Sequence, residues 1–146
     1  MTRDMDLSVE ERDDFLGSGG TGVLALASGS DEAPHALPVS YGYDPEIPQL
    51  YFRLATGPSH QKGRVTDRAA TFVTYALSDS RWTSVIAQGN LEKTTRESIA
   101  IETLAGLERV DIPFVDIFGA PPQEVTFTFV RLAPETISAR TETPTD

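Results

Sequence analysis

The sequence predicts a single domain of the α+β class, built as a six-stranded antiparallel β-barrel with two or three flanking helices. Apolar segments bounded by glycine, proline and polar turn residues recur six times along the chain. The few helical patterns do not alternate regularly with strands, as they would beside a parallel sheet. The length of 146 residues suits one domain, and no internal repeat is visible. We expect residues 1–7 and 141–146 to be flexible.

The first half of the chain is expected to contain one helix followed by three strands. Ser8 and Glu11 form a capping-box pattern, which predicts a short helix to about Leu16. The glycines that follow end this helix. Polar residues 29–32 form a turn between the first two strands, and two prolines break the chain before the third. The expected strands are 22–27, 35–43 and 49–54.

The second half adds three strands and a second helix. Gly89 lies inside a strand, which indicates a β-bulge or the close approach of another backbone. A capping pattern at residues 94–97 predicts a helix to about Leu107. The apolar face of this helix is expected to consist of Ile99, Ile101, Leu104 and Leu107. Residues 111–122 are expected to form an apolar loop with a short turn of helix. The expected strands are 69–77, 82–93 and 123–132, the last continuing over 134–140 after a break.

Charge and composition limit the partners that the chain can have. The 22 acidic residues exceed the 12 basic ones and give a net charge of -10, which disfavours nucleic acids and anionic membranes as partners. Only Lys62 and Lys93 are lysines, since every other basic residue is arginine. An acidic chain poor in lysine resembles proteins adapted to a high-salt cytosol, so we expect a halophilic protein.

Several chemistries are excluded by composition. Cysteine is absent, which excludes disulfides, thiolate metal sites, iron–sulfur clusters and a cysteine nucleophile. The sequence has neither a metal-spaced histidine pair nor a nucleophile elbow, so we expect no metal site and no hydrolase of those types. No apolar run approaches the ~20 residues that a membrane span needs, and the N-terminal residues do not form a secretory signal. We expect a soluble, cytoplasmic protein.

Residues 57–64, Gly-Pro-Ser-His-Gln-Lys-Gly-Arg, carry the strongest local signal for a ligand. They place a hydroxyl, an imidazole, an ammonium and a guanidinium beside a helix start predicted near Ser59. Amides at a helix N-terminus carry a partial positive charge, and nearby cations neutralise a dianion. The segment therefore predicts a phosphate site, with a solvated polar turn as the alternative.

Three further stretches accompany this segment. They are His-Ala-Leu-Pro-Val-Ser-Tyr at 35–41, Leu-Tyr-Phe-Arg-Leu-Ala at 50–55 and Arg-Trp-Thr-Ser-Val-Ile-Ala-Gln-Gly at 81–89. In this order, and followed by a helix and the closing strand with Arg-Leu-Ala-Pro at 131–134, they resemble the pyridoxamine 5'-phosphate oxidase-like superfamily of FMN-binding split β-barrels. The resemblance covers roughly residues 9 to 138. It implies that the predicted barrel is a split barrel.

The resemblance also implies a function. The chain would be an FMN-binding flavoprotein, an oxidoreductase acting on a small-molecule substrate, and a homodimer with the flavin between its two subunits. Ser59, His60 and Lys62 would bind the FMN phosphate, and Arg53 with the neighbouring backbone would meet the polar edge of the ring. The complete set of expected cofactor-binding residues is Pro38, Val39, Ser40, Phe52, Arg53, Leu54, Ser59, His60, Lys62, Trp82 and Ser84. No catalytic residue is assigned.

Two members of that set come from the stretch at 81–89. Ser84 would hydrogen-bond the flavin or its tail, whereas Trp82 would pack either at the dimer seam or in the core. Both residues belong to what resembles the central strand of the family, and the stretch at 35–41 would place its main chain against the isoalloxazine ring.

Departures from the family leave other functions open. Gln61 stands where the oxidases tend to have a second basic residue, and their arginine- and tryptophan-rich segment that clamps pyridoxal phosphate has no counterpart here. We therefore do not expect oxidation of vitamin B6. The alternatives are a split barrel that binds a deazaflavin, one that binds haem through one of the two histidines, His35 or His60, and a non-enzymatic flavin-binding protein.

Overall fold

The computed structural model describes residues 2–29, 31–55, 68–109 and 127–144. Their elements, in order, are β1 (Thr2–Asp6), α1 (Val9–Leu16), β2 (Gly19–Leu26), β3 (His35–Asp44), β4 (Gln49–Ala55), β5 (Ala69–Ser78), β6 (Arg81–Thr94), a 3-10 turn (Arg96–Ser98), α2 (Ile101–Arg109) and β7 (Phe127–Pro144). The helix predicted near Ser59, the loop predicted at 111–122 and the first residues of the last predicted strand lie outside these ranges.

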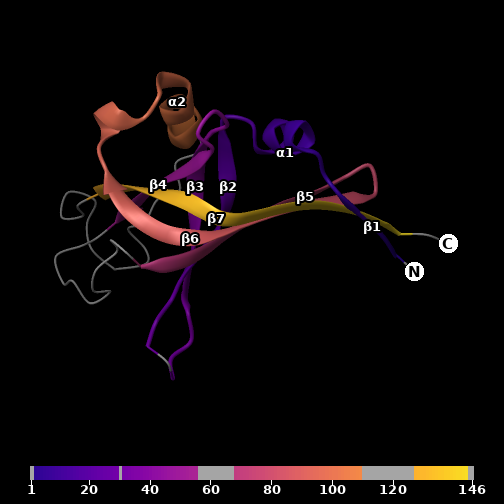
Figure 1. The fold of residues 1–146 in the computed structure, drawn as a ribbon, viewed down its shortest axis with the longest axis horizontal. Helices are drawn as coiled ribbons and strands as arrows, with labels where there is room; N and C mark the ends of the chain where they lie inside the picture. The colour runs from indigo at the N-terminus through magenta and orange to yellow at the C-terminus, as the bar shows by residue number, and fades with distance from the viewer. Residues whose placement is uncertain (1, 30, 56–67, 110–126, 145–146) are drawn as a thin grey trace.

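Six of the described strands close into an antiparallel barrel in the order β7-β4-β3-β2-β5-β6, and β6 pairs with β7 to complete it. The predicted α+β barrel is therefore confirmed. In Figure 1, β5, β6 and β7 continue past the barrel as a long arm, and β1 pairs with the end of β7. Across the described ranges, no helix is long and apolar enough to cross a membrane.

The two chain ends differ from the prediction of flexible tails. Residues 2–6 form β1 and pair residue by residue with 140–144 of β7. Within this pairing Thr141 opposes Met5, and on its other side it opposes Thr83 of β6. The sequence shows no apolar pattern here because this part of the sheet is held together by backbone hydrogen bonds between polar residues.

The ladder between β3 and β4 is shorter than the strands themselves. It runs from Asp44 opposite Gln49 to Tyr41 opposite Phe52 and stops there. Beyond this point β3 pairs only with β2, as far as His35, and β4 pairs only with β7, as far as Ala55. The barrel is therefore split between these two strands, as the fold predicted from the resemblance requires.

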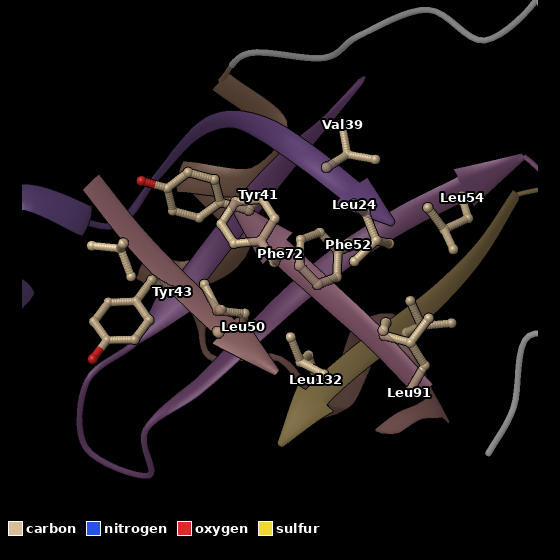
Figure 2. Packing of buried hydrophobic residues seen from close by; sticks show 14 of the residues in the cluster. Leu24, Val39, Tyr41, Tyr43, Leu50, Phe52, Leu54, Phe72, Leu91 and Leu132 are labelled. Carbon is tan, nitrogen blue, oxygen red and sulfur yellow. The ribbon is translucent and has the colours of Figure 1, made fainter. Parts of the chain in front are cut away.

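The barrel interior is filled by large apolar side chains from alternate strand positions. The ring of Phe72 on β5 lies at its centre, with the rings of Tyr41 and Phe52 each 5.1 Å away between centroids. Figure 2 shows leucines from several strands around these three rings, among them Leu24, Leu50 and Leu132. Burial of each such side chain contributes about 1.5–3 kcal/mol, so this cluster fixes the shape of the barrel.

Helix α1 begins as predicted. The Ser8 hydroxyl accepts from the Glu11 amide, and the Glu11 carboxylate accepts from the Ser8 amide. Two tyrosines of β3 then hold the helix against the barrel, because Tyr43 donates to the Asp13 carboxylate at 2.6 Å and Tyr41 donates to the Leu16 carbonyl at 2.9 Å. Burial raises the pKa of both phenols to about 12, so both keep the protons that these hydrogen bonds need.

The second helix begins later than predicted. Thr95 makes no side-chain cap, residues 96–98 form only a 3-10 turn, and Ile99 is extended before α2 starts at Ile101. Ile99, Leu104 and Leu107 pack together, as predicted for the apolar face, and they do so around Tyr51. Ile101 is 86% exposed and does not belong to this face. The break in the helix rotates Ile101 away from the sheet.

The bulge predicted at Gly89 is confirmed, and the predicted break in the last strand is not. Gln88 opposes Thr136 and Gly89 opposes Pro134, so Glu135 is the extra residue and β7 continues through it. A Cβ atom at Gly89 would collide with the carbonyl oxygen of Ala133. The bulge also accommodates Pro134, whose missing N–H would weaken a regular central strand.

A buried hydroxyl provides a first test of the packing. Among the described residues, the Thr141 hydroxyl is buried without a hydrogen-bond partner, and the side chain is only 2% exposed. Because an unpaired buried hydroxyl costs roughly 1–3 kcal/mol, Thr141→Val should raise the free energy of unfolding by about 1 kcal/mol and Tm by about 2–4 °C. Thermal and urea unfolding measure this.

The matched control is Thr103→Val. Thr103 is equally buried, but its hydroxyl donates to the Tyr43 carbonyl at 3.3 Å. This variant should lose stability instead of gaining it, because the Tyr43 carbonyl loses its partner. Destabilisation by both variants would show that the Thr141 hydroxyl makes a bond that the folded chain needs.

Candidate functional site

The split between β3 and β4 brings together six of the eleven residues that the sequence singles out. Pro38, Val39 and Ser40 lie on the β3 side, directly beyond the last paired residue, Tyr41. On the β4 side, Phe52 is the last paired residue, and Arg53 and Leu54 follow it. The two stretches come from different strands and form the two edges of one opening.

The split offers main-chain groups to a ligand. Val39, Phe52 and Leu54 point into the barrel core and are almost fully buried, so only their backbone atoms can meet a ligand. Backbone N–H and C=O groups need hydrogen-bond partners, and a strand with a neighbour on one side only leaves about half of them without a ladder partner. A flat ligand with a polar edge would supply those partners.

Arg53 adds a cation at one edge of this opening. Its side chain is half-buried on the outer surface of β4, and its guanidinium carbon lies 4.6 Å from the ring centroid of Phe127 on β7. Stacking on an aromatic face orients the planar guanidinium and leaves its N–H groups directed outward from the ring. Phe127 was not singled out in the sequence, since an aromatic residue at a strand start carries no sign of what stacks on it.

Trp82 and Ser84 do not lie at the split of the same chain. Both belong to β6, and strands β2 and β5 separate β6 from β3 in the sheet. Trp82 is 44% exposed and its ring lies 5.9 Å from that of Tyr75, so it is not a core residue. One chain therefore does not bring these two residues together with Arg53 and Ser40.

Trp82 instead belongs to an exposed apolar surface, here named the apolar face. Residues directly opposite on paired strands share one side of a sheet, and Pro38 opposes Val23, Val23 opposes Val73, and Val73 opposes Ile86. Leu77 opposes Trp82 on the same side, two residues beyond Tyr75. The apolar face consists of Val23, Pro38, Val73, Tyr75, Leu77, Trp82 and Ile86. Because Pro38 is also at the split, this surface reaches the edge of the opening.

The three residues assigned to the phosphate, Ser59, His60 and Lys62, lie outside the described residues. The described residues before them end at Ala55 of β4, and those after them begin at Arg68. Arg68 is anchored on both sides, because its Nε donates to the Ala27 carbonyl at 2.7 Å and its own carbonyl accepts from the Leu91 amide at 2.9 Å. The phosphate assignment stays a prediction.

Comparison with known proteins places the chain in a family. A sequence profile described as pyridoxamine 5'-phosphate oxidase matches residues 8–141. Similar solved structures include an FAD-binding protein from Mycobacterium smegmatis, with a TM-score of 0.66, 18% identity and coverage of 97% of this chain and 100% of that one. An FAD-binding protein from Mesorhizobium loti has a TM-score of 0.64 and 22% identity, over 99% of this chain and 100% of that one.

A third similar structure is an FAD- and haem-binding protein from Mycobacterium smegmatis, with a TM-score of 0.65 and 19% identity, over 98% of this chain and 76% of that one. At such identities these three likenesses show the fold alone. No protein with a curated description matches the sequence. Because the profile extends from the cap of α1 into the last part of β7, the chain belongs to the pyridoxamine 5'-phosphate oxidase family.

Proposed function

We propose that this chain is an oxidoreductase that binds a flavin by its FMN portion at the split between β3 and β4. The observation that carries the proposal is the early end of the β3–β4 ladder, beyond which the facing edges of these two described strands do not pair with each other. The isoalloxazine ring is flat, and its polar edge carries carbonyl and N–H groups that suit such edges. Similar structures are described as binding FAD, which supports a flavin here.

Each described residue at the split has a distinct part in this proposal. The main chain of Pro38, Val39 and Ser40 faces the ring from one edge, and that of Phe52 and Leu54 from the other. The Arg53 guanidinium, oriented by Phe127, hydrogen-bonds the carbonyl edge. The bound flavin supplies the hydride or electron transfer, while the protein positions it and controls access of a small-molecule substrate.

We further propose that the functional unit is a homodimer in which the apolar face is covered by a second copy. An exposed apolar patch of this extent on a chain of net charge -10 is otherwise unfavourable in water. In such a dimer Trp82 and Ser84 of one copy lie against the split of the other, since the apolar face reaches Pro38. This arrangement accounts for the separation of these two residues from the split within one chain.

Haem remains the competing ligand, because one similar structure is described as binding both FAD and haem. Of the two histidines, His35 is half-buried at the first residue of β3, and His60 lies outside the described residues. The visible absorption spectrum separates the possibilities, because haem gives a Soret band and flavins do not.

Titration of the purified protein with FMN at high salt tests the proposal. The wild type should bind FMN stoichiometrically. Lys62→Ala should weaken binding by roughly 1.5–3 kcal/mol, which is about 10- to 150-fold in Kd, because a charge-assisted phosphate contact is lost. Lys93→Ala is the matched control, since Lys93 is exposed on β6 and should be neutral. Equal affinities of wild type and Lys62→Ala would remove Lys62 from the phosphate site.

The acidic charge leads us to propose adaptation to high salt as well. At low ionic strength the net charge of -10 makes the folded chain repel itself, whereas at 1 M salt the Debye length falls to about 3 Å. Tm should therefore rise between 0.1 M and 2 M KCl, by about 2–4 °C for each kcal/mol gained. A Tm that is constant or falls over this range would contradict halophilic adaptation.

A further inference from the structure

A groove separate from the split lies on the outer surface of β2, β5 and β6. Its volume is about 330 Å³, within the range of small-molecule sites. It is lined by Ala25, Ala27, Pro34, Ala69, Ala70, Thr71, Gln88, Gly89, Asn90 and Glu135. Four alanines and Gly89 contribute a shallow apolar floor, and Thr71, Gln88, Asn90 and Glu135 contribute the polar groups. Of these residues, Gln88 and Gly89 belong to the stretch at 81–89 that resembles the family, but none of the lining residues was expected to bind a cofactor.

The β-bulge in β7 is what directs a carboxylate into this groove. In a regular strand neighbouring side chains point to opposite faces, so either Glu135 or Thr136 would point into the barrel. Because Glu135 is the extra residue opposite Gln88 and Gly89, it lines the groove, while Thr136 still reaches Gln88 on the same outer surface. Bulges that redirect a side chain are frequent beside binding sites.

The amides of the groove are positioned for a ligand that both donates and accepts hydrogen bonds. The Gln88 Nε2 donates to Thr71 Oγ1 at 3.3 Å, and the Gln88 Oε1 accepts from Thr136 Oγ1 at 3.3 Å. These bonds fix the orientation of the Gln88 amide and leave it one N–H and one lone pair. Asn90 follows two residues later on the same side of β6 and presents a second amide to the groove.

The charge of the groove selects a neutral ligand portion. Glu135 is the one ionisable residue among the described lining residues, so a phosphate or carboxylate directly beside it would be repelled, whereas the Arg68 guanidinium bonds Ala27 at the border of the groove. Amide side chains pair with the amino group and ring nitrogen of adenine in a bidentate arrangement, and a carboxylate accepts from an amino or ribose hydroxyl group. A flat purine ring also suits the alanine floor.

We propose that this groove binds the adenosine portion of an adenine nucleotide, and that in the flavin-bound protein this is the adenosine of FAD. The FAD assignment rests on the proposed flavin function. Gln88 lies four residues from Ser84 on the same side of β6, which is about 13 Å along the strand. The groove also adjoins Arg68, whose Nε donates to the carbonyl of the lining residue Ala27 and which supplies a cation for a diphosphate. An extended dinucleotide can therefore reach from Ser84 to the groove.

The experiment compares FMN and FAD on the same protein. The wild type should bind FAD at least tenfold more tightly than FMN. Ala69→Phe fills the groove from the exposed first residue of β5 and should abolish this preference while the Kd for FMN changes less than twofold. Glu135→Ala, a smaller change, should reduce the preference. Ala105→Phe, the same substitution on the exposed side of α2, should leave both affinities unchanged.

Each outcome decides the proposal. Equal affinities for FMN and FAD in the wild type, or equal weakening of both by Ala69→Phe, would overturn the FAD assignment while flavin binding itself stands. If neither flavin binds, the proposed function fails, and calorimetric titration with adenosine then decides the groove. Adenosine binding that Ala69→Phe abolishes and guanosine does not reproduce would support the groove, with a free adenine nucleotide as its ligand. No binding of adenosine to the wild type in that case would overturn it.

Discussion

Ile86→Asp is expected to leave the chain folded but to convert it from a dimer to a monomer that no longer retains flavin. Ile86 belongs to the apolar face, where it opposes Val73, and it is 39% exposed, so a carboxylate there stays hydrated in the monomer. In the proposed dimer the same carboxylate would be buried beside a second strongly acidic copy. Like charges at an interface cost several kcal/mol, so the dimer dissociation constant should rise by about 100-fold or more.

Analytical ultracentrifugation and flavin titration measure the two effects on one preparation. Ile101→Asp is the matched control, because it replaces an isoleucine that is more exposed and lies on α2, away from the apolar face. Both variants should keep the far-UV circular dichroism of the wild type. A monomeric Ile86→Asp protein that binds flavin with unchanged Kd would show that one chain holds the complete site, and a protein that stays dimeric would place the interface elsewhere.

The barrel could be predicted from the sequence because its strands carry their information locally. Alternating apolar residues and turn residues bound β3 and β4 to within one residue of the expected limits. The Ser8 capping box is equally local, since both partners lie within four residues. The prediction of where α2 starts was wrong because Thr95 has the sequence of a cap, but its hydroxyl bonds the Ser98 hydroxyl instead of a helix amide. Strand β1 has no local signal, since its pairing partner lies at the other end of the chain.

The residues of the candidate site also differ in how far the sequence could place them. The resemblance to the family was enough to select Ser40 and Arg53, and the structure brings them to one opening because neighbouring strands of a meander place consecutive segments side by side. The resemblance was not enough to separate Ser84 from them, since that depends on the two strands between β3 and β6. Glu135 was missed for a different reason. Gly89 signals the bulge in the sequence, but the residue that the bulge redirects belongs to the opposite strand.

Helix α2 packs on the barrel by direct contact of backbone with backbone. A Cβ atom on Gly106 would collide with the Ser18 carbonyl, and one on Gly19 would collide with the Gly106 carbonyl. On the next strand, a Cβ atom at Gly42 would meet the Thr103 carbonyl within 3.0 Å. These glycines let the helix approach the paired end of β3 and β4, and this paired end fixes where the split begins.

Gly106→Ala should therefore destabilise the protein, although alanine favours helix over glycine by about 1 kcal/mol. Overpacking costs typically 1–3 kcal/mol. Here the new Cβ atom meets the Ser18 carbonyl, and no side-chain rotation can move either atom away. We expect a net loss of about 2 kcal/mol in the free energy of unfolding, which is the upper overpacking cost less the gain in helix propensity, and a fall in Tm of roughly 4–8 °C. Urea and thermal unfolding give both numbers.

Gly29→Ala separates this effect from a general cost of removing glycine. Among the described residues, a Cβ atom at Gly29 would meet only the end of the Glu32 side chain, at 3.4 Å, so this variant should be within about 0.5 kcal/mol of the wild type. Stabilisation by Gly106→Ala would mean that helix propensity outweighs the contact and that α2 does not lie this close to β2. A loss confined to Gly106→Ala would instead show that the helix is held at backbone distance, which is the support that the paired end of the split requires.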